Sequence, residues 1–593
     1  MSFSMNFGKP GKGGAPTPRA PGKLRIAVLG DFSARANRGL LDRGDALAKR
    51  KPIRLDVDNL EDVLARFAPT LNLPLGAGGA VEFSPTSLED LHPDQLYEKL
   101  EIFAELNSLR RRLASAKTFK SAADEVLGWA GVAESLTAAP RRARGNALRL
   151  DAKLSDFARL VGAPTVDAQA PTEVDELLKR VVGPHVVAAD DPDQPALVAA
   201  VDKALSAAMS EVLHHPDFQA LEASWRSLDF LVRRIETDVS LQLVAFDVSA
   251  EEFAADLSSG ESLDECALYK LLVENPALDA DQGPYGAIIG NYGFEMTPPH
   301  AELLGRAAHL AAAAQAPFIA AIGTECINAK LEDQHPLVTQ AWNALRALPQ
   351  AGFLGLITPR FLLRAPYAEK SESIDAFEYE EFDFHAGLKA LLWGNPAIVA
   401  ATLLGNAFSA QGAKMKLNSV LGLDDMPYFF YEDQDGDQQA FPCAERLLSE
   451  KRATHVTQQN FIPLLALKGR PELRLGGFIS VAGGALLGPW SPPDKLVMPT
   501  FAGAASAAPA PAPVAVVEDE PEDDAVSVAE IAESAVEEEA APEVAAVADA
   551  PAEDSDPELD ALLAEIEAAA APPPAADEEE IDPELAALLA DLE

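Results

Sequence analysis

The stretch LRIAVLGDFS, residues 24–33, gives the first indication of the fold. It opens with a run of β-branched and other apolar residues, which Gly30 and Asp31 then interrupt. A short apolar run that ends in turn-forming residues predicts a buried strand that enters a loop. The sequence therefore predicts a β-strand at the start of the first folded region.

The residues that follow predict alternating strands and helices. RKPIRLDVDNLEDVLARFAP, residues 50–69, predicts a short strand and then a helix, with Asp58 or Asn59 as its N-cap and apolar residues on one face. AVEFSPTSLEDLHP, residues 80–93, predicts another strand followed by a turn.

A long amphipathic helix is predicted from Pro93, because proline is favoured in the first turn of a helix. Its expected apolar face consists of Leu96, Leu100, Phe103, Leu106 and Leu113. Three consecutive arginines, residues 110–112, come near its end. We expect them to form a solvated face, and a partner-binding patch is the alternative.

A second, larger region shows the same alternation. Residues 201–235 predict two helices because Pro216 interrupts the pattern. Strands are expected in 240–249 and 283–294, a helix and then a strand in 303–322, and a strand and loop in 353–367. This order predicts an α/β (α+β) fold in which two domains have mixed sheets and flanking helices.

Changes in composition divide the chain into five segments. Gly/Pro-rich and Ala/Arg/Pro-rich stretches predict flexible connections, and the Ala/Pro/Glu/Asp-rich end predicts a disordered tail. The predicted segments are a flexible leader (1–22), a first domain (23–129), a linker (130–194), a second domain (195–495) and an acidic tail (496–593).

Charge and cysteine content exclude several classes of protein. The formal net charge is −45, and the residues after Lys495 include 28 Asp and Glu but no Lys or Arg. Such a chain repels phosphate backbones, so we expect no nucleic-acid partner. Cys266, Cys326 and Cys443 lie far apart and predict buried thiols in a reducing compartment. Without a signal peptide or an apolar run long enough to span a membrane, the sequence predicts a cytoplasmic protein.

Three apparent chemical motifs have simpler structural explanations. GPYGAIIG, residues 283–290, lacks the glycine spacing of a nucleotide-binding loop. EDQDGDQQ, residues 432–439, lacks the bidentate glutamate of a calcium loop and predicts an acidic hairpin turn. His214 and His215 are adjacent, so on a helix they point about 100° apart and cannot share one ion. We expect no catalytic residue, cofactor or metal.

The acidic tail contains a repeated motif. DPELDALLAEIE, residues 556–567, recurs as DPELAALLADLE, residues 582–593. In both copies an Asp-Pro-Glu start favours a helix N-terminus, and apolar residues then recur at helical spacing. These residues are Leu559, Leu562, Leu563 and Ile566 in the first copy and Leu585, Leu588, Leu589 and Leu592 in the second. They predict two short helices that bind an unidentified protein by inserting an apolar stripe into its groove, and low-complexity drift is the alternative.

Several stretches resemble the sheath proteins of type VI secretion systems. Residues 23–128 are similar to the small subunit, TssB or VipA, in LRIAVLGDFS, RKPIRLDVDNLEDVLARFAP, VEFSPTSLEDLHPDQL and LNSLRRRLASAK. Residues 200–490 are similar to the large subunit, TssC or VipB. That resemblance lies in LHHPDFQALEASWRSLDFLV, PYGAIIGNYGF, AAQAPFIAAI, LITPRFLLRAPY, EYEEF, LLWGNPAI and PCAERLLSE.

The resemblance implies a structural role and no active site. In that family the two subunits pair and polymerise helically around an inner tube of Hcp, contraction drives the tube through the envelope, and the ATPase ClpV recycles the sheath. The expected partners are therefore sheath subunits, the inner-tube protein, baseplate components and a ClpV-type ATPase. We expect no membrane insertion.

The sequence departs from this family at three places. A Gly/Pro-rich leader stands where the small subunit carries a strand that it donates to a neighbour. The acidic tail stands where the large subunit continues into a C-terminal part. The helix recognised by ClpV would lie within the linker. Two hypotheses remain, namely a fused sheath protomer and a sheath-derived adaptor that docks on the sheath or baseplate and recruits a partner through its tail. An α/β enzyme is a third and would require a catalytic set in a cleft.

Overall fold

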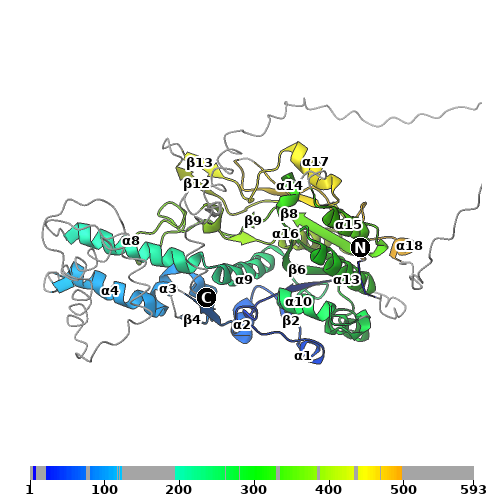
Figure 1. The fold of residues 1–593 in the computed structure, drawn as a ribbon, viewed down its shortest axis with the longest axis horizontal. Helices are drawn as coiled ribbons and strands as arrows, with labels where there is room; N and C mark the ends of the chain where they lie inside the picture. The colour runs from blue at the N-terminus through cyan, green and yellow to red at the C-terminus, as the bar shows by residue number, and fades with distance from the viewer. Residues whose placement is uncertain are drawn as a thin grey trace, which may run out of the picture.

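The computed structural model describes residues 5–8, 22–74, 81–115, 118, 121–122, 194–260, 262–279, 281–328, 334–382, 387–432, 438–467 and 469–496 (Figure 1). Its centre is one large sheet with helices on both faces. The predicted α/β class with mixed strands is confirmed.

Within the described residues, nine strands form the large sheet in the order β11-β15-β14-β8-β7-β6-β1-β5-β2. Their bounds are β1 Leu24–Gly30, β2 Ile53–Leu55, β5 Leu241–Asp247, β6 Ala287–Phe294, β7 Phe318–Ile322, β8 Leu354–Thr358, β11 Gly422–Leu423, β14 Ile462–Ala466 and β15 Leu473–Leu475. The middle strands are parallel, whereas β2 and the β15–β11 pair are antiparallel additions at the two edges. The described residues also form two-stranded ribbons: β3 Leu71–Leu73 with β4 Val81–Phe83, β9 Phe361–Leu362 with β10 Trp393–Gly394, and β12 Phe429–Glu432 with β13 Gln438–Phe441.

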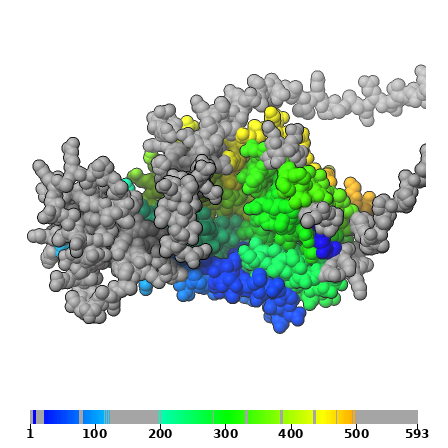
Figure 2. All heavy atoms as spheres, viewed as in Figure 1, coloured from blue at the N-terminus to red at the C-terminus, as the bar shows by residue number. Residues whose placement is uncertain are grey.

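Strand β1 lies inside this sheet, between two strands of the larger region. It pairs in parallel with β5 from Leu24–Leu241 to Gly30–Asp247, and with β6 from Ile26–Ala287 to Leu29–Gly290. All seven of its residues are buried, as expected for a parallel strand covered on both faces. The sequence predicts two domains with mixed sheets, and the structure shows one large sheet to which both regions contribute. In the space-filling view the first region, in blue, lies directly against the larger region, in green (Figure 2).

Helices cover the two faces of the sheet. The first face carries α2 (Leu60–Phe67), α9 (Pro216–Arg234) and α16 (Pro396–Gln411), which pack on the core that receives Leu24, Ile26 and Val28 of β1. The second carries α10 (Ala250–Leu257), α13 (Pro298–Ala314) and α15 (Pro336–Arg346), which pack on the core that receives Ala27 and Leu29. The alternating side chains of β1 therefore contribute to both hydrophobic cores.

Local sequence explains where the main helices begin. Helices α9, α13 and α16 each have proline at their first position, and the residue before it accepts a hydrogen bond from a backbone N–H of the first turn. These capping residues are His215, Thr297 and Asn395. His215 thus serves as a helix cap.

Helices α3 (Pro93–Lys99), α4 (Glu101–Ala114) and α8 (Gln194–Leu213) extend from one end of the sheet (Figure 1). The prediction of one long helix from Pro93 is wrong, because Leu100 has an extended backbone that separates α3 from α4. The two helices, α3 and α4, contact different parts of the chain. Asp94 of α3 accepts hydrogen bonds from the backbone N–H groups of Asp375 and Ala376, whereas Arg110 of α4 pairs with Asp202 of α8.

The other helical segments are short, apart from α17. They are α1 Asp45–Ala48, α11 Ala267–Tyr269, α12 Asn275–Leu278, α14 Glu325–Asn328, α17 Glu450–Gln458, α18 Pro493–Leu496, the 3-10 turns η1 Glu89–Leu91, η2 Leu263–Glu265, η4 Pro349–Phe353, η5 Gly387–Ala390 and η6 Gly412–Lys414, and the π-helical turn η3 Lys270–Glu274.

Part of the N-terminal leader, residues 5–8, contacts the folded region. Met5 packs on the core under α13, and a Cβ added at Gly305 of α13 would overlap the ring of Phe7. Residues 5–8 therefore contact α13, while the flexible leader over 1–22 remains a prediction.

Candidate functional site

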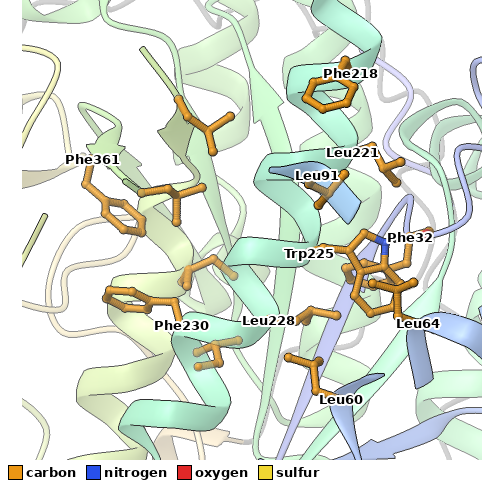
Figure 3. Close-up of a cluster of buried hydrophobic side chains, with 14 of the residues drawn as sticks. Phe32, Leu60, Leu64, Leu91, Phe218, Leu221, Trp225, Leu228, Phe230 and Phe361 are labelled. Carbon is orange, nitrogen blue, oxygen red and sulfur yellow. Dashed lines mark hydrogen bonds between the residues drawn. The ribbon is translucent and has the colours of Figure 1, made fainter. Parts of the chain in front are cut away.

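Polar and apolar side chains from both sequence regions meet at the junction between these regions. Helix α9 occupies its centre, with residues of the first region on one side and residues of the larger region on the other (Figure 3). Ten of its residues are buried, so nearly its whole circumference makes contacts.

Trp225 of α9 anchors the first region. Its ring centroid lies 5.9 Å from those of both Phe32 and Phe67, which are themselves 6.0 Å apart. Its indole Nε1 donates a hydrogen bond of 2.9 Å to the backbone carbonyl of Phe32. On the opposite side of α9, Phe230 packs on Phe361 with 5.3 Å between the ring centroids (Figure 3). The helix therefore contacts both regions through aromatic side chains.

The loop after β1 is fixed by the carboxylate that ends its neighbour β5. Asp247 accepts hydrogen bonds from the backbone N–H of Phe32 (2.9 Å), from the backbone N–H of Ser33 (3.1 Å) and from the Ser33 hydroxyl (2.6 Å). The carboxyl ends of parallel strands lie at one edge of the sheet, and this places the two groups together. A side chain of the larger region thus holds the first loop of the smaller one.

A buried ion network forms a second connection. Glu252 of α10 is fully buried and accepts hydrogen bonds from Arg35 Nε (2.9 Å) and Arg50 Nη2 (2.5 Å). Arg35 and Arg50 also share Asp42. Burial opposes ionisation of Glu252, but the hydrogen bonds from Arg50 and from backbone N–H groups outweigh it, so the Glu252 pKa lies below its ordinary value. The carboxylate remains charged and paired at neutral pH.

A second buried ion network includes Glu222 of α9. Arg364 donates to Glu222 Oε1 (2.8 Å) and to Glu381 Oε2 (2.5 Å), and all three side chains are almost fully buried. Burial alone would raise the Glu222 pKa, but the charges of Arg364 and Arg226 lower it. Arg226 also donates to the Tyr367 hydroxyl (3.0 Å). The first region contributes through His92, whose ring packs edge-on against Tyr367 at 5.0 Å.

The structure places the other predicted features as follows. His214 Nε2 lies 3.8 Å from Glu381, and burial lowers the pKa of His214. His215 caps α9, so the two adjacent histidines have different neighbours and do not form a common site. Strands β12 and β13 confirm the hairpin around 432–439, although the turn itself, residues 433–437, lies outside the described residues. Arg110 pairs with Asp202 at 2.6 Å while its side chain stays 35% exposed, and Arg111 is exposed, in agreement with the expected solvated face. The eight tail residues Leu559, Leu562, Leu563, Ile566, Leu585, Leu588, Leu589 and Leu592 lie outside the described residues.

The three cysteines are buried and unpaired, as predicted. Burial raises the pKa of Cys266 and Cys443 to about 11 and that of Cys326 to about 12. These thiols are therefore protonated at neutral pH and are poor nucleophiles. Among the described residues, no group of three or more His, Cys, Asp and Glu side chains is arranged to hold a metal ion.

Sequence reasoning did not find the two ion networks. The Ser249–Glu252 capping box could have been read from its spacing, and it is formed in the structure. The partners Arg35 and Arg50 lie more than 200 residues earlier in the chain, and one sequence does not show that they meet Glu252.

Comparison with known families supplies the identity of the two regions. The sequence model of the VipA family of type VI secretion systems matches residues 23–126, and that of the VipB (EvpB) tail sheath N-terminal domain matches residues 195–482. The chain carries both type VI sheath domains. Residues 23–126 are therefore called the VipA domain and residues 195–482 the VipB domain, and the junction described above lies between them.

A curated relative supports the second assignment. The chain is similar to the type VI secretion system sheath protein TssC1 of Pseudomonas aeruginosa, with 30% identity over 288 residues. The match covers 46% of this chain and 58% of that protein, so the chain spans little more than half of its relative's length. No helix in the described part of the chain is long and apolar enough to cross a membrane.

Proposed function

We propose that this protein is a structural component of a type VI secretion sheath, in which its VipA and VipB domains act as one fused protomer. The observation that carries this proposal is the position of β1 between β5 and β6. The VipA domain supplies an internal strand of the VipB sheet, so pairing of the two domains occurs within one chain. A covalent connection replaces a bimolecular encounter with a high local concentration.

The junction supports a mechanical role. Sheath contraction requires protomers that move relative to one another while each keeps its own shape. Interiors packed with aromatic side chains and paired charges resist deformation, and α9 provides both between the domains. The proposed partners are further sheath subunits, the inner-tube protein and baseplate components, with a ClpV-type ATPase for disassembly. We propose no enzymatic activity and a cytoplasmic location, and the three free cysteines support a reducing compartment.

Electron microscopy of the purified full chain tests this function. We expect helical tubules from this chain alone or with the inner-tube protein. Separate VipA-type and VipB-type subunits in the same buffer serve as the control that conditions permit polymerisation. Particles that remain monomeric where the control polymerises would refute a fused sheath protomer.

A second candidate function is a sheath-derived adaptor. It is favoured by the docking of Met5 and Phe7 on α13 of their own chain, because the related segment is expected to reach a neighbouring protomer in the family. An adaptor would bind only the ends of tubules formed by separate subunits. Immunogold labelling along the tubule length would exclude it.

A further inference from the structure

An open apolar groove lies at the end of the described chain. It has a volume of about 550 Å³ and is formed by η4, by the residues after η6 and by the loop 480–492. Met415, Leu417, Leu487 and Trp490 line it and are half-buried, so their apolar surface is only partly covered. Its volume falls in the range of about 300–1,000 Å³ that is usual for ligand sites.

The rim of this groove is positively charged. Lys416 and Lys495 line it and are exposed. Within the described residues neither ammonium group takes part in an ion pair. Because the chain carries a net charge of −45, two unpaired lysines beside an apolar surface favour an acidic, amphipathic occupant.

The chain itself contains such an occupant. The motifs 556–567 and 582–593 combine a four-residue apolar stripe with acidic residues and contain no Lys or Arg. We propose that the first motif, residues 556–567, occupies this groove of its own chain as a short helix, with the apolar stripe against Leu417, Leu487 and Trp490 and the acidic residues near Lys416 and Lys495. Helix-in-groove binding uses the same spacing of apolar residues that both motifs show.

The connection between groove and motif favours binding within one chain. The tail leaves the described structure at Leu496, directly after Lys495 on the rim, and the first motif begins about 60 residues later. The composition of this connection predicts a flexible tether, and a tether of that length would span on the order of 40 Å, which corresponds to an effective concentration in the millimolar range. A second copy at micromolar concentration would compete poorly. This inference is independent of the sheath proposal, since groove occupancy and tubule formation are measured separately.

Binding of a fluorescent peptide, residues 554–569, to the full chain tests the proposal by anisotropy. The receptor with an empty groove is the full chain with Leu562, Leu563, Leu588 and Leu589 replaced by Ser. We expect this receptor to bind the peptide at least about tenfold more tightly than the unmodified chain, whose own tail competes. Equal affinity of the two proteins would overturn the proposal.

Charge variants locate the site. In the empty-groove receptor, Lys416→Glu with Lys495→Glu should weaken peptide binding about tenfold or more and remove its salt dependence. Lys414→Glu is the matched control, because Lys414 is exposed nearby but does not line the groove. A peptide with Leu562→Ser and Leu563→Ser should not bind. If Lys414→Glu were as damaging as the pair, the groove would not be the site.

Cross-linking distinguishes binding of the motif to the groove of its own chain from binding to a second copy. A photoreactive group in place of Leu563 in the full chain should give intramolecular links to residues 415–417 or 487–490 by mass spectrometry. Dimers on a denaturing gel would assign the motif to a second copy, and links to other residues would exclude the groove. Either result would overturn the proposal.

Discussion

Trp225 combines apolar packing with a hydrogen bond at the centre of the molecule. It is fully buried, and its N–H satisfies the carbonyl of Phe32 from the other domain. The pattern of 201–235 predicts a helix after the break at Pro216, and the structure confirms the helix that carries Trp225. The pattern does not identify Phe32 as its neighbour, because the two residues are 193 positions apart.

We predict that Trp225→Ala lowers the free energy of unfolding by about 3–5 kcal/mol, because it leaves a large cavity between the domains. Trp225→Phe should cost about 1–3 kcal/mol, because the Phe32 carbonyl then stays buried without its donor. Chemical denaturation measures both. Phe430→Ala is the control: this side chain is 58% exposed, so its loss should change stability by no more than about 0.5 kcal/mol. An effect of that size for Trp225→Ala would contradict the packing described here.

Glu252 gives a prediction that depends on pH. At pH 7, Glu252→Gln should lower the free energy of unfolding by about 3 kcal/mol or more, because Arg35 and Arg50 lose their buried counter-charge. The folded-state pKa of Glu252 lies below its ordinary value of 4.5, so its contribution is present above that value and is lost as the pH falls through the folded-state pKa.

The difference between Glu252→Gln and the unmodified chain should therefore shrink on acidification below pH 4.5. Denaturation curves at a series of pH values measure it. Glu251→Gln, which alters the exposed neighbour of Glu252, should show little difference at any pH. A constant difference for Glu252→Gln down to strongly acidic pH would contradict the assigned direction.

At the scale of elements, the sequence predicts strands and helices well and their neighbours poorly. LRIAVLG is correctly predicted as a buried strand, since its apolar run is a local property. Its place between β5 and β6 depends on pairing across more than 200 residues, which one sequence does not record. The break at Leu100 has a similar origin: α3 and α4 are each held by tertiary partners that override a continuous helical pattern.

The leader segment supplies a prediction about one element. Gly305→Leu should displace Phe7 from α13, because any side chain at this position overlaps the ring. The expected result is faster amide hydrogen exchange at residues 5–8, with exchange in β1 and β6 unchanged. Phe7→Ala should reproduce this effect from the other partner. If Gly305→Leu left exchange at residues 5–8 unchanged, the contact would be incorrect.

At the scale of the whole molecule, the shared sheet joins the domains more firmly than the polypeptide between them does. We predict that the domains stay together after the connection is cut. A site-specific protease sequence inserted after Arg149 allows cleavage of the full chain in its folded state. Both fragments should then elute together in gel filtration and separate only in denaturant.

The uncut chain in the same column is the control for this experiment. Separate elution of the fragments in native buffer would contradict the shared sheet. The domain boundaries 23–129 and 195–495 remain predictions, since what the structure shows is a common sheet across them.

The internal position of β1 also has a consequence for synthesis of the chain. Ribosomes add about 5–20 residues per second, so β1 leaves the ribosome roughly 10–40 s before β5 and longer before β6. During that interval an apolar strand that will lie inside a sheet has neither neighbour. Nascent chains of this protein should therefore need a chaperone bound at LRIAVLG until residue 294 has emerged from the ribosome. Ribosome profiling of chaperone-bound nascent chains would measure the chain lengths over which the chaperone stays bound.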